Sequence, residues 1–244
     1  MQLTGTIEAK TRTVVYDTGG FRGYTDFMIE SDPTLRPAPQ VFLVHQQPDW
    51  VLRTHFHLEE QFQVVLGGSG SLGPHPLAPV SIHYASREAG YGPLIAGPKG
   101  LDYLTLRCAG GLGIWYLPEQ REKMRANLAK RQEHVGPVAV SSPAQLALRT
   151  QTSIEVLIAP EDSGLAAWML RLGPGAKLKS PVHENGGGSY CVIVSGTLER
   201  EKTLSTPACM FTSPEEAPLS LCAGSGGLEM LLLQFPARAL EQSP

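Results

Sequence analysis

The chain has 244 residues, of which 42% are hydrophobic and 18% are charged, so a folded globular protein is expected and a disordered one is excluded. The formal net charge of −3 gives no electrostatic basis for binding nucleic acid or an anionic membrane. No apolar run approaches the ~18 residues of a membrane span, and the segment MQLTGTIEAKTRTVVYD lacks the apolar core of a signal peptide. A cytoplasmic protein is therefore expected.

The cysteines show no C-x-x-C spacing. Free, mostly buried thiols in a reducing compartment are therefore expected. Cys209 and Cys222 could face each other across a hairpin, so a disulfide between them stays open as an alternative. The four cysteines are Cys108, Cys191, Cys209 and Cys222.

Short apolar runs alternate with glycine and proline turns from the N-terminus to Leu117. Runs at intervals of roughly 8–12 residues, with turn signals between them, predict the strands of an all-β sandwich or barrel. The runs are LTGTIEA, TRTVVYD, YTDFMIE, QVFLVHQ, QFQVVLGG and SIHYAS, followed by a group from Tyr91 to Leu117.

A helix is predicted over residues 118–135. Pro118 suits the first turn of a helix, acidic residues follow it, and Lys130 and Arg131 lie near the end, as the helix dipole favours. The apolar stripe of this segment is narrow, which predicts a surface linker with a solvated charged face. After Gly136 and Pro137 the β pattern resumes and continues to Phe235.

The second half of the chain repeats the first. The run VVLGGSGSL matches VIVSGTLE, so that Gly196 lies 128 residues after Gly68, and AGPKGLDYLTL matches AGSGGLEMLLL, so that Gly227 lies 127 residues after Gly100. Two matches at nearly one offset predict a duplicated domain. The predicted domains are residues 1–117, a linker helix at 118–135, and residues 136–244.

His55 and His57 lie two positions apart, just before the apolar run QFQVVLGG. In an extended chain, residues two apart point to the same face, so both imidazoles should enter one space. Neutral imidazoles suit Zn, Fe, Ni, Cu or Mn. The pair therefore predicts part of a metal site.

These residues form a frame that resembles the two motifs of the cupin superfamily. The first motif is matched by His55, His57 and Gly68, with Gln61 where the family has Glu; the second is matched by Gly92, Pro98 and Gly100, with Tyr103 where the family has His. The resemblance implies an all-β fold of two tandem cupin (jelly-roll type) β-barrels joined by a short α-helix. It also implies a divalent transition metal (Fe, Mn, Ni or Zn) and no organic cofactor.

The departures from the frame leave the metal site open. Gln61 offers only a neutral carbonyl oxygen, and Tyr103 is a ligand only when deprotonated. The metal set would be His55, His57 and Gln61; the alternative is two hydrogen-bonding histidines in a polar pocket without metal. A shift in the turn would bring Glu60 to the ligand position, against two turn carboxylates that simply face solvent.

Further candidates surround this pair. His83 could serve as third ligand or as acid/base, or be a hydrogen-bonded residue of the barrel wall. Tyr103 could line the cavity or belong to the core. Arg53 shares the face of the histidines and could hold a substrate carboxylate or lie in water at the barrel mouth. Gln61 and Gln63, two apart, should both face inward and make the cavity polar.

In the second domain the equivalent positions offer one good ligand and a thioether. A structural barrel, or one that forms a dimer interface, is therefore expected there. The four positions are His183, Asn185, Ser189 and Met230.

Three functions follow from these residues. The first is a mononuclear-metal oxygenase or isomerase in the N-terminal barrel. The second is a non-catalytic bicupin that binds a small acid or sugar. The third is a metal-independent acid/base enzyme that uses His57, Tyr103 and His83. In each case the partner is a small molecule and the expected assembly is a homodimer, with no nucleic acid and no membrane.

Overall fold

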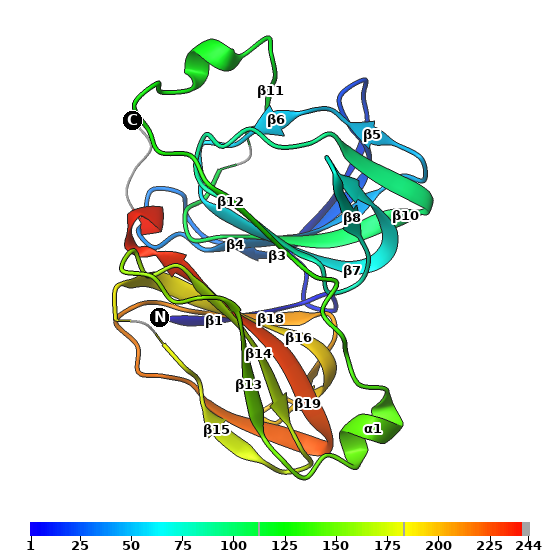
Figure 1. Cartoon of the computed structure of the whole chain (residues 1–244), viewed down its shortest axis with the longest axis vertical. Helices are drawn as coiled ribbons and strands as arrows, with labels where there is room; N and C mark the ends of the chain where they lie inside the picture. The colour runs from blue at the N-terminus through cyan, green and yellow to red at the C-terminus, as the bar shows by residue number, and fades with distance from the viewer. Residues whose placement is uncertain (112, 183, 241–244) are drawn as a thin grey trace. The chain divides into compact units, whose positions relative to one another are not determined.

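The computed structural model describes residues 1–111, 113–182 and 184–240, and almost all of its regular structure is β-strand. The chain forms two compact units (Figure 1). The N-terminal unit runs from Lys10 to Val138, and the C-terminal unit combines Met1–Ala9 with the described chain from Ala139 to Leu240. None of the helices described is long and apolar enough to cross a membrane.

The N-terminal unit is built on a nine-stranded antiparallel sheet with the order β12-β9-β7-β10-β4-β3-β2, to which β5 and β8 add as short side pairs, and on a separate pair of β6 with β11. Its elements are β2 (Arg12–Asp17), β3 (Arg22–Glu30), β4 (Gln40–Gln46), β5 (Val51–Leu52), β6 (His55–Phe56), β7 (Gln61–Leu72), β8 (His75–Leu77), β9 (Ile82–Ala85), β10 (Leu94–Arg107), β11 (Trp115–Tyr116), the 3-10 turn η1 (Arg121–Lys123) and β12 (Gln132–Val135).

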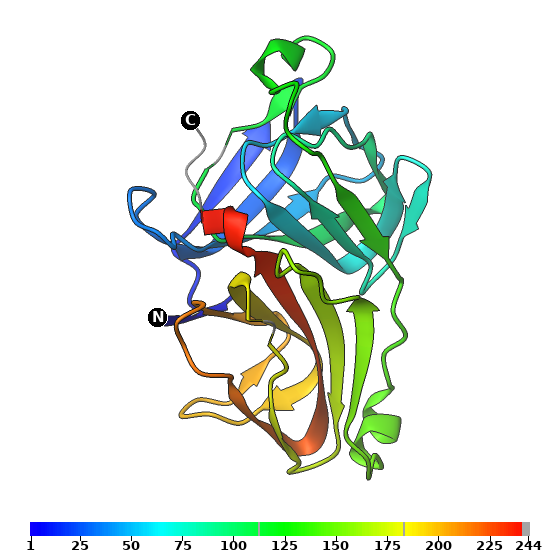
Figure 2. The ribbon, with the colours of Figure 1, turned by 60° about the vertical axis from the view of Figure 1, so that its left-hand side comes forward.

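The C-terminal unit is built on an eight-stranded sheet with the order β1-β18-β16-β19-β14-β13, in which β15 and β17 are side pairs. The strand β19, orange to red, lies between β16 and β14 (Figures 1 and 2). The elements are β1 (Gln2–Thr6), α1 (Pro143–Ala147), β13 (Ser153–Ile158), β14 (Ala166–Leu172), β15 (Lys177–Lys179), β16 (Gly186–Leu198), β17 (Leu204–Ser205), β18 (Ala208–Thr212), β19 (Ser220–Pro236) and η2 (Ala237–Leu240).

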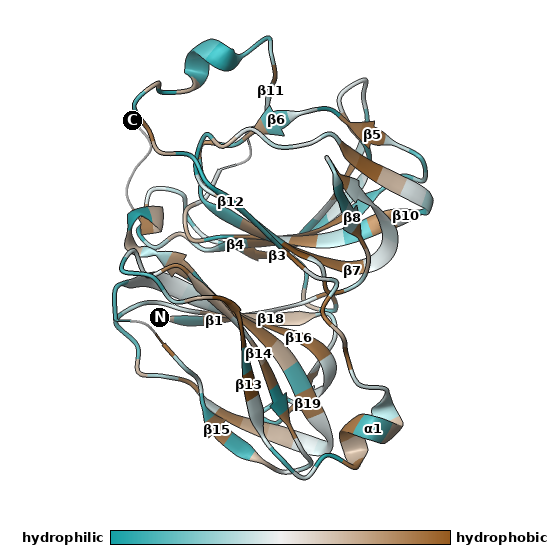
Figure 3. Cartoon of the chain, viewed as in Figure 1, coloured by the Kyte–Doolittle hydropathy of each residue, from teal (hydrophilic) through white to brown (hydrophobic). Residues whose placement is uncertain are grey.

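The interiors of the two units differ in polarity. In the C-terminal unit, apolar side chains of β14, β16 and β19 form one closed cluster, and these strands carry long hydrophobic stretches in Figure 3. In the N-terminal unit the apolar cluster includes Tyr91 and Tyr103, and buried polar residues such as Gln61 and Gln63 accompany it. Buried amides need hydrogen-bond partners, so this interior must also contain a polar network.

The glycines of the sequence repeat have the same conformation in both units. Gly68 has a φ of 72°, and a Cβ there would lie 2.1 Å from the carbonyl oxygen of Gly100. Gly196 has a φ of 73°, and its Cβ would lie 2.1 Å from the carbonyl oxygen of Gly227. In each unit, only glycine allows this close approach of the two longest strands.

Three expectations about the architecture are wrong. The hydrogen-bonded order of strands ends at β12 and β2 in one sheet and at β1 and β13 in the other, so the sheets are not closed barrels. The segment 118–135 is not a linker helix; it holds the short turn η1 and the strand β12. Its narrow apolar stripe could not anchor a helix, whereas β12 gains main-chain hydrogen bonds along β9. Residues 1–9 do not belong to the first domain, because β1 pairs with β18.

Two smaller points concern α1 and the cysteines. The helix α1, which the sequence analysis missed, has a capping box in which Ser142 and Gln145 bond each other's backbone N–H. All four cysteines are free, as expected, and Cys222 is the one that is only partly buried.

Candidate functional site

The N-terminal unit contains a cavity of about 220 Å³ between its strands. The adjacent strands β7 and β10 send every second side chain into it, as the twofold alternation of a strand requires. Phenylalanines and apolar residues complete the wall. From β7 and β10 come Gln61, Gln63, Tyr103, Thr105 and Arg107, and the remaining wall includes His55, His57, Phe21, Phe27, Phe42, Tyr91, Ile114 and Tyr116.

Both histidines of the H-x-H pair lie in this cavity, with ring centroids 5.2 Å apart. The Nδ1 atom of His55 is 2.7 Å from the carbonyl oxygen of Arg53, and that of His57 is 2.5 Å from the carbonyl oxygen of Gly113. A carbonyl oxygen only accepts, so Nδ1 of His55 carries the proton and its Nε2 keeps a lone pair. Nδ1 of His57 has the Gly113 carbonyl oxygen as an acceptor and, at 3.0 Å, Nη2 of Arg107 as a donor, and these two neighbours favour opposite tautomers. Within the described chain, neither Nε2 has a hydrogen-bond partner.

Both imidazoles are neutral at physiological pH. Burial lowers the pKa of His55 to about 4, against a raising effect of its bond to the Arg53 carbonyl. Burial also lowers the pKa of His57 well below its usual value, and the positive charge of Arg107 adds to this effect. The pair therefore presents two uncharged imidazoles to whatever enters the cavity, and Nε2 of His55 is an acceptor there.

The residue that dominates the electrostatics of the cavity is Arg107, which is only 2% exposed. Its Nε and Nη2 lie 3.2 and 2.9 Å from Oε1 of Gln61, and Nη2 lies 3.0 Å from Nδ1 of His57. Its Nη1 donates to the carbonyl oxygen of Gly111. The carboxylate of Glu59 is 3.7 Å from Nη1, and burial raises the pKa of Glu59 although Arg107 opposes that shift.

Sequence analysis missed Arg107, although a signal for it was present. Tyr103, Thr105 and Arg107 follow one another at the two-residue period of a strand. If Tyr103 and Thr105 face the cavity, the next side chain on that face is the guanidinium. A charged residue that continues the inward face of an apolar strand is rarely buried without a role in the interior.

Two tyrosines add hydrogen-bond donors to the cavity. The hydroxyl of Tyr91 accepts a bond of 2.5 Å from Nε2 of Gln61, which leaves the proton of Tyr91 available for another acceptor. Burial raises the pKa of Tyr91 and of Tyr103, so both phenols stay protonated. Tyr103 is 5% exposed and lines the cavity, the first of the two placements that its sequence left open.

The predicted metal ligands do not form a complete set. Oε1 of Gln61 accepts from Arg107, so the only oxygen that Gln61 could offer to a metal is already used. The described residues include no group of three His, Cys, Asp or Glu side chains arranged to hold a metal ion. Two imidazoles beside a fixed positive charge fall short of the three protein ligands of a typical catalytic site. The residues present do not fit a divalent ion.

Glu60 does not complete the site, and the solvent-facing alternative is also wrong. Glu60 is 2% exposed and accepts a hydrogen bond from the hydroxyl of Tyr84. Its Oε1 lies 3.8 Å from Nε of Arg87. These groups do not line the cavity. Because neighbouring positions of a strand alternate, a chain that sends Gln61 into the cavity sends Glu60 to the other face.

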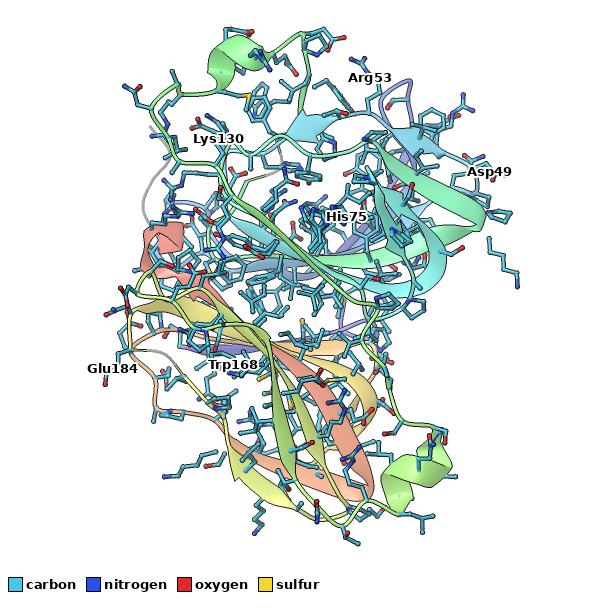
Figure 4. The ribbon with its side chains drawn as sticks, in the orientation of Figure 1. Asp49, Arg53, His75, Lys130, Trp168 and Glu184 are labelled. Carbon is cyan, nitrogen blue, oxygen red and sulfur yellow. The ribbon has the colours of Figure 1, made fainter. Side chains whose placement is uncertain are left out.

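The other predicted site residues lie at different depths. Arg53 does not line the cavity; its guanidinium pairs with Glu119, and Figure 4 shows Arg53 at the periphery of the unit. His83 is buried behind the wall, and its Nδ1 lies 2.8 Å from Oε1 of Gln63. Gln63 lines the cavity and thus connects it to His83.

The three described equivalents in the C-terminal unit, Asn185, Ser189 and Met230, are not gathered around such a cavity. Met230 is fully buried in the apolar cluster, and the side chain of Asn185 is exposed and donates to the carbonyl oxygen of Asp162. Ser189 is buried in β16. His183, the one good ligand expected there, lies outside the described residues.

No protein-family model matches the sequence. No curated protein matches it either. Solved structures match over nearly the whole chain at low identity. A dioxygenase candidate from Nostoc punctiforme has a TM-score of 0.63 at 11% identity, with 100% of this chain and 82% of that chain covered. Oxalate decarboxylase of Bacillus subtilis, whose Mn(II) centres have been studied, has a TM-score of 0.59 at 12% identity and covers 96% of this chain and 77% of its own.

The bacterial pirin YhhW of Escherichia coli, solved with nickel(II), has a TM-score of 0.58 at 14% identity, with 97% of this chain and 99% of that chain covered. These neighbours are cupin-fold proteins, and the chain shares their fold. At this identity the likeness shows the fold alone. Some of these neighbours contain a divalent metal. Whether the residues of this cavity could hold one therefore has to be judged from the cavity itself.

Proposed function

We propose that the N-terminal unit binds a small organic acid in its cavity and does so without a metal. The observation that carries the proposal is Arg107, a buried guanidinium that lines the cavity between Gln61 and His57. A permanent positive charge in a low-dielectric interior attracts an anion much more strongly than it would in water. The partner carboxylate of Glu59 stands 3.7 Å away, outside the cavity wall.

The remaining groups of the cavity suit an acid that carries a hydroxyl. The phenols of Tyr91 and Tyr103 are donors for a carboxylate, and Nε2 of His55 is an acceptor for a hydroxyl. Phenylalanine rings also line the cavity and suit a short apolar body. A volume of about 220 Å³ is smaller than the roughly 300–1,000 Å³ of drug-sized pockets, so the ligand is a compact metabolite.

Thermal-shift and calorimetric titration with a panel of small carboxylic acids, hydroxy acids and neutral sugars would test this proposal. A hydroxy acid is expected to raise Tm equally with and without chelator, because the bound ligand stabilises the folded state by mass action. Arg107→Met should remove the shift. The matched control is Arg53→Met, the same change at an exposed arginine of the same unit, which should retain it. Binding that is lost with chelator, or kept in Arg107→Met, would refute the proposal.

A second candidate is the mononuclear-metal oxygenase or isomerase, and one observation favours it. His55 donates its Nδ1–H to a backbone carbonyl, which is how metal-binding histidines are commonly oriented. The metal-containing neighbours support the same candidate at the level of the fold. Elemental analysis of the purified protein beside His55→Ala would support it if one equivalent of metal were present and lost in the variant.

A metal-independent acid/base reaction is compatible with the first proposal. His57 is a neutral acceptor and Tyr103 a neutral donor on the same cavity, whereas His83 contacts the cavity only through Gln63. Such an enzyme would show bell-shaped pH dependence and no response to chelator. We also propose that the chain is a bicupin, on the basis of the matching glycine geometry in the two units. The homodimer remains a prediction.

A further inference from the structure

We propose that the guanidinium of Arg107 supplies the positive charge that a metal ion would supply if one were bound beside His55 and His57. We also propose that the Arg107–Gln61 pair keeps divalent ions out of this site. The inference rests on the metal-free binding of the proposed function and goes further, because it names the pair of residues that makes the site unfavourable for a cation. It starts from the contacts of one side chain. Arg107 touches two of the three residues that the sequence predicts as metal ligands, at 2.9 Å from Gln61 and 3.0 Å from His57.

The charge at position 61 is the second step. A site that holds a divalent cation normally includes a carboxylate that balances its charge. In this chain that position is the neutral Gln61, whose Oε1 accepts two bonds from the guanidinium while its Nε2 bonds Tyr91. The amide is therefore oriented by the arginine on one side and the phenol on the other. Gln61 and Arg107 act as one unit that replaces a carboxylate and a cation.

Repulsion is the third step. The guanidinium cannot be deprotonated within the physiological range, so the positive charge is always present. An ion held by Nε2 of both histidines would share a buried space with that charge, and like charges in such a space repel strongly. The charge of Arg107 already acts on both imidazoles, because it lowers the pKa of His55 and of His57. His55 keeps the orientation of a metal ligand, but the arginine makes the space beside it unfavourable for a cation.

Equilibrium dialysis against Zn²⁺, Mn²⁺ and Ni²⁺ tests this inference on the full chain. We compare the wild type with Arg107→Met and with the double variant Gln61→Glu/Arg107→Met, which removes the cation and provides a carboxylate. The double variant is expected to bind one equivalent of at least one of these ions about 100-fold more tightly than the wild type, and Arg107→Met alone about 10-fold more tightly. Adding His55→Ala to the double variant should abolish the gain.

Arg53→Met is the matched control, because it removes the same charge from the periphery of the unit and should leave metal affinity unchanged. Circular dichroism and thermal melting confirm that each variant is folded. If the double variant does not fold, the comparison of Arg107→Met with the wild type decides alone. A wild type that binds one equivalent as tightly as the double variant, or an Arg107→Met protein with no gain over the wild type, would overturn the inference.

The outcome is separable from that of the proposed function. Acid binding is measured in the presence of chelator, whereas metal binding is measured without any acid. A protein that gains metal in the double variant but binds no acid refutes the proposed ligand and supports this inference. A protein that binds acid in chelator but holds metal tightly as wild type refutes this inference and leaves the acid site standing.

Discussion

The two units use one backbone frame for two different interiors. In the N-terminal unit Tyr103 pairs with Val65 and Thr105 with Gln63, and in the C-terminal unit the equivalent positions of the repeat pair in the same way. The inward side chains differ in kind: they are polar in the first unit and apolar in the second, apart from Gln234 and from Ser189, the equivalent of Gln61. Gln63, Tyr103, Thr105 and Arg107 correspond to Cys191, Met230, Leu232 and Gln234.

The shared fold sets where the side chains point, whereas the size and polarity of those side chains decide whether a cavity forms between the strands. In the C-terminal unit, Met230 and Leu232 belong to a closely packed cluster with Cys191 and Ile193. In the N-terminal unit the same rows leave about 220 Å³ open and line it with groups that can bond a ligand. A shared fold therefore says little about the activity of either unit.

The largest expected effect is a difference in stability loss between substitutions at one pair of equivalent positions, Leu232 and Thr105. Leu232→Ala removes a fully buried side chain from the packed cluster and is expected to cost about 2–5 kcal/mol of stability. Thr105→Ala removes only a hydroxyl and a methyl group beside the cavity and is expected to cost about 1 kcal/mol. Urea unfolding of both variants measures the difference. Equal losses would mean that the two interiors are packed alike.

The second largest effect is expected from a fall in pH, which should destabilise the N-terminal unit more than the C-terminal unit. Six of the seven histidines lie between Lys10 and Val138, and His55 is the best defined, because burial lowers its pKa to about 4 from 6.5. The unfolded chain takes up a proton first, so the stability that His55 contributes is complete above pH 6.5 and is lost as the pH falls towards 4. The shift corresponds to about 3 kcal/mol.

Hydrogen exchange at pH 7.5 and pH 5.0 should therefore show weaker protection at pH 5.0 in β7 and β10, and little change in β16 and β19. His55→Asn retains a donor for the Arg53 carbonyl and removes the titration, so it should reduce the difference between the two pH values. Equal loss of protection in both units would show that the acid effect does not arise in the N-terminal unit.

Many features of the two units could be predicted from the sequence, and there are physical reasons why the others were missed. The strands, the repeat and the cavity position of His55 and His57 follow from period-two patterns and fixed glycine spacing, which are local properties. Arg107 was missed because charged side chains are rarely buried, and only the three-dimensional pairing of β10 with β7 brings it to Gln61. The helix predicted at 118–135 was wrong for a similar reason. Its last four residues form the strand β12, and the pairing of β12 with β9 at the edge of the sheet outweighs the local helix propensity.

Exchange of the equivalent residues Tyr103 and Met230 tests whether the cavity depends on its phenols. Tyr103→Met removes a donor from the cavity and is expected to weaken acid binding about tenfold, with little loss of stability. Met230→Tyr places a hydroxyl in the packed cluster and is expected to cost about 1–3 kcal/mol without creating an acid site. Titration calorimetry and unfolding of both variants give the two readouts. Unchanged acid affinity in Tyr103→Met would remove the phenol from the proposed ligand contacts.

The smallest expected effect concerns the edge strand β12, which contains a histidine. The edge strands of the C-terminal sheet, β1 and β13, contain none. His134 on β12 stacks between His75 and His83, with ring centroids 3.8 and 4.6 Å away. Burial, followed by the neighbouring charge of His75, lowers the pKa of His134 to about 4.

Protonation of His134 as the pH falls from 6.5 towards 4 should loosen β12 before the rest of the sheet, because it places a charge in a half-buried stack of rings. His134→Phe keeps the stacking and removes the titration, so hydrogen exchange of residues 132–135 at pH 5 should be slower in the variant than in the wild type. The same change at pH 7.5, where His134 is neutral, should have no effect. Equal exchange at pH 5 would show that the column packs the edge of the sheet without responding to acid.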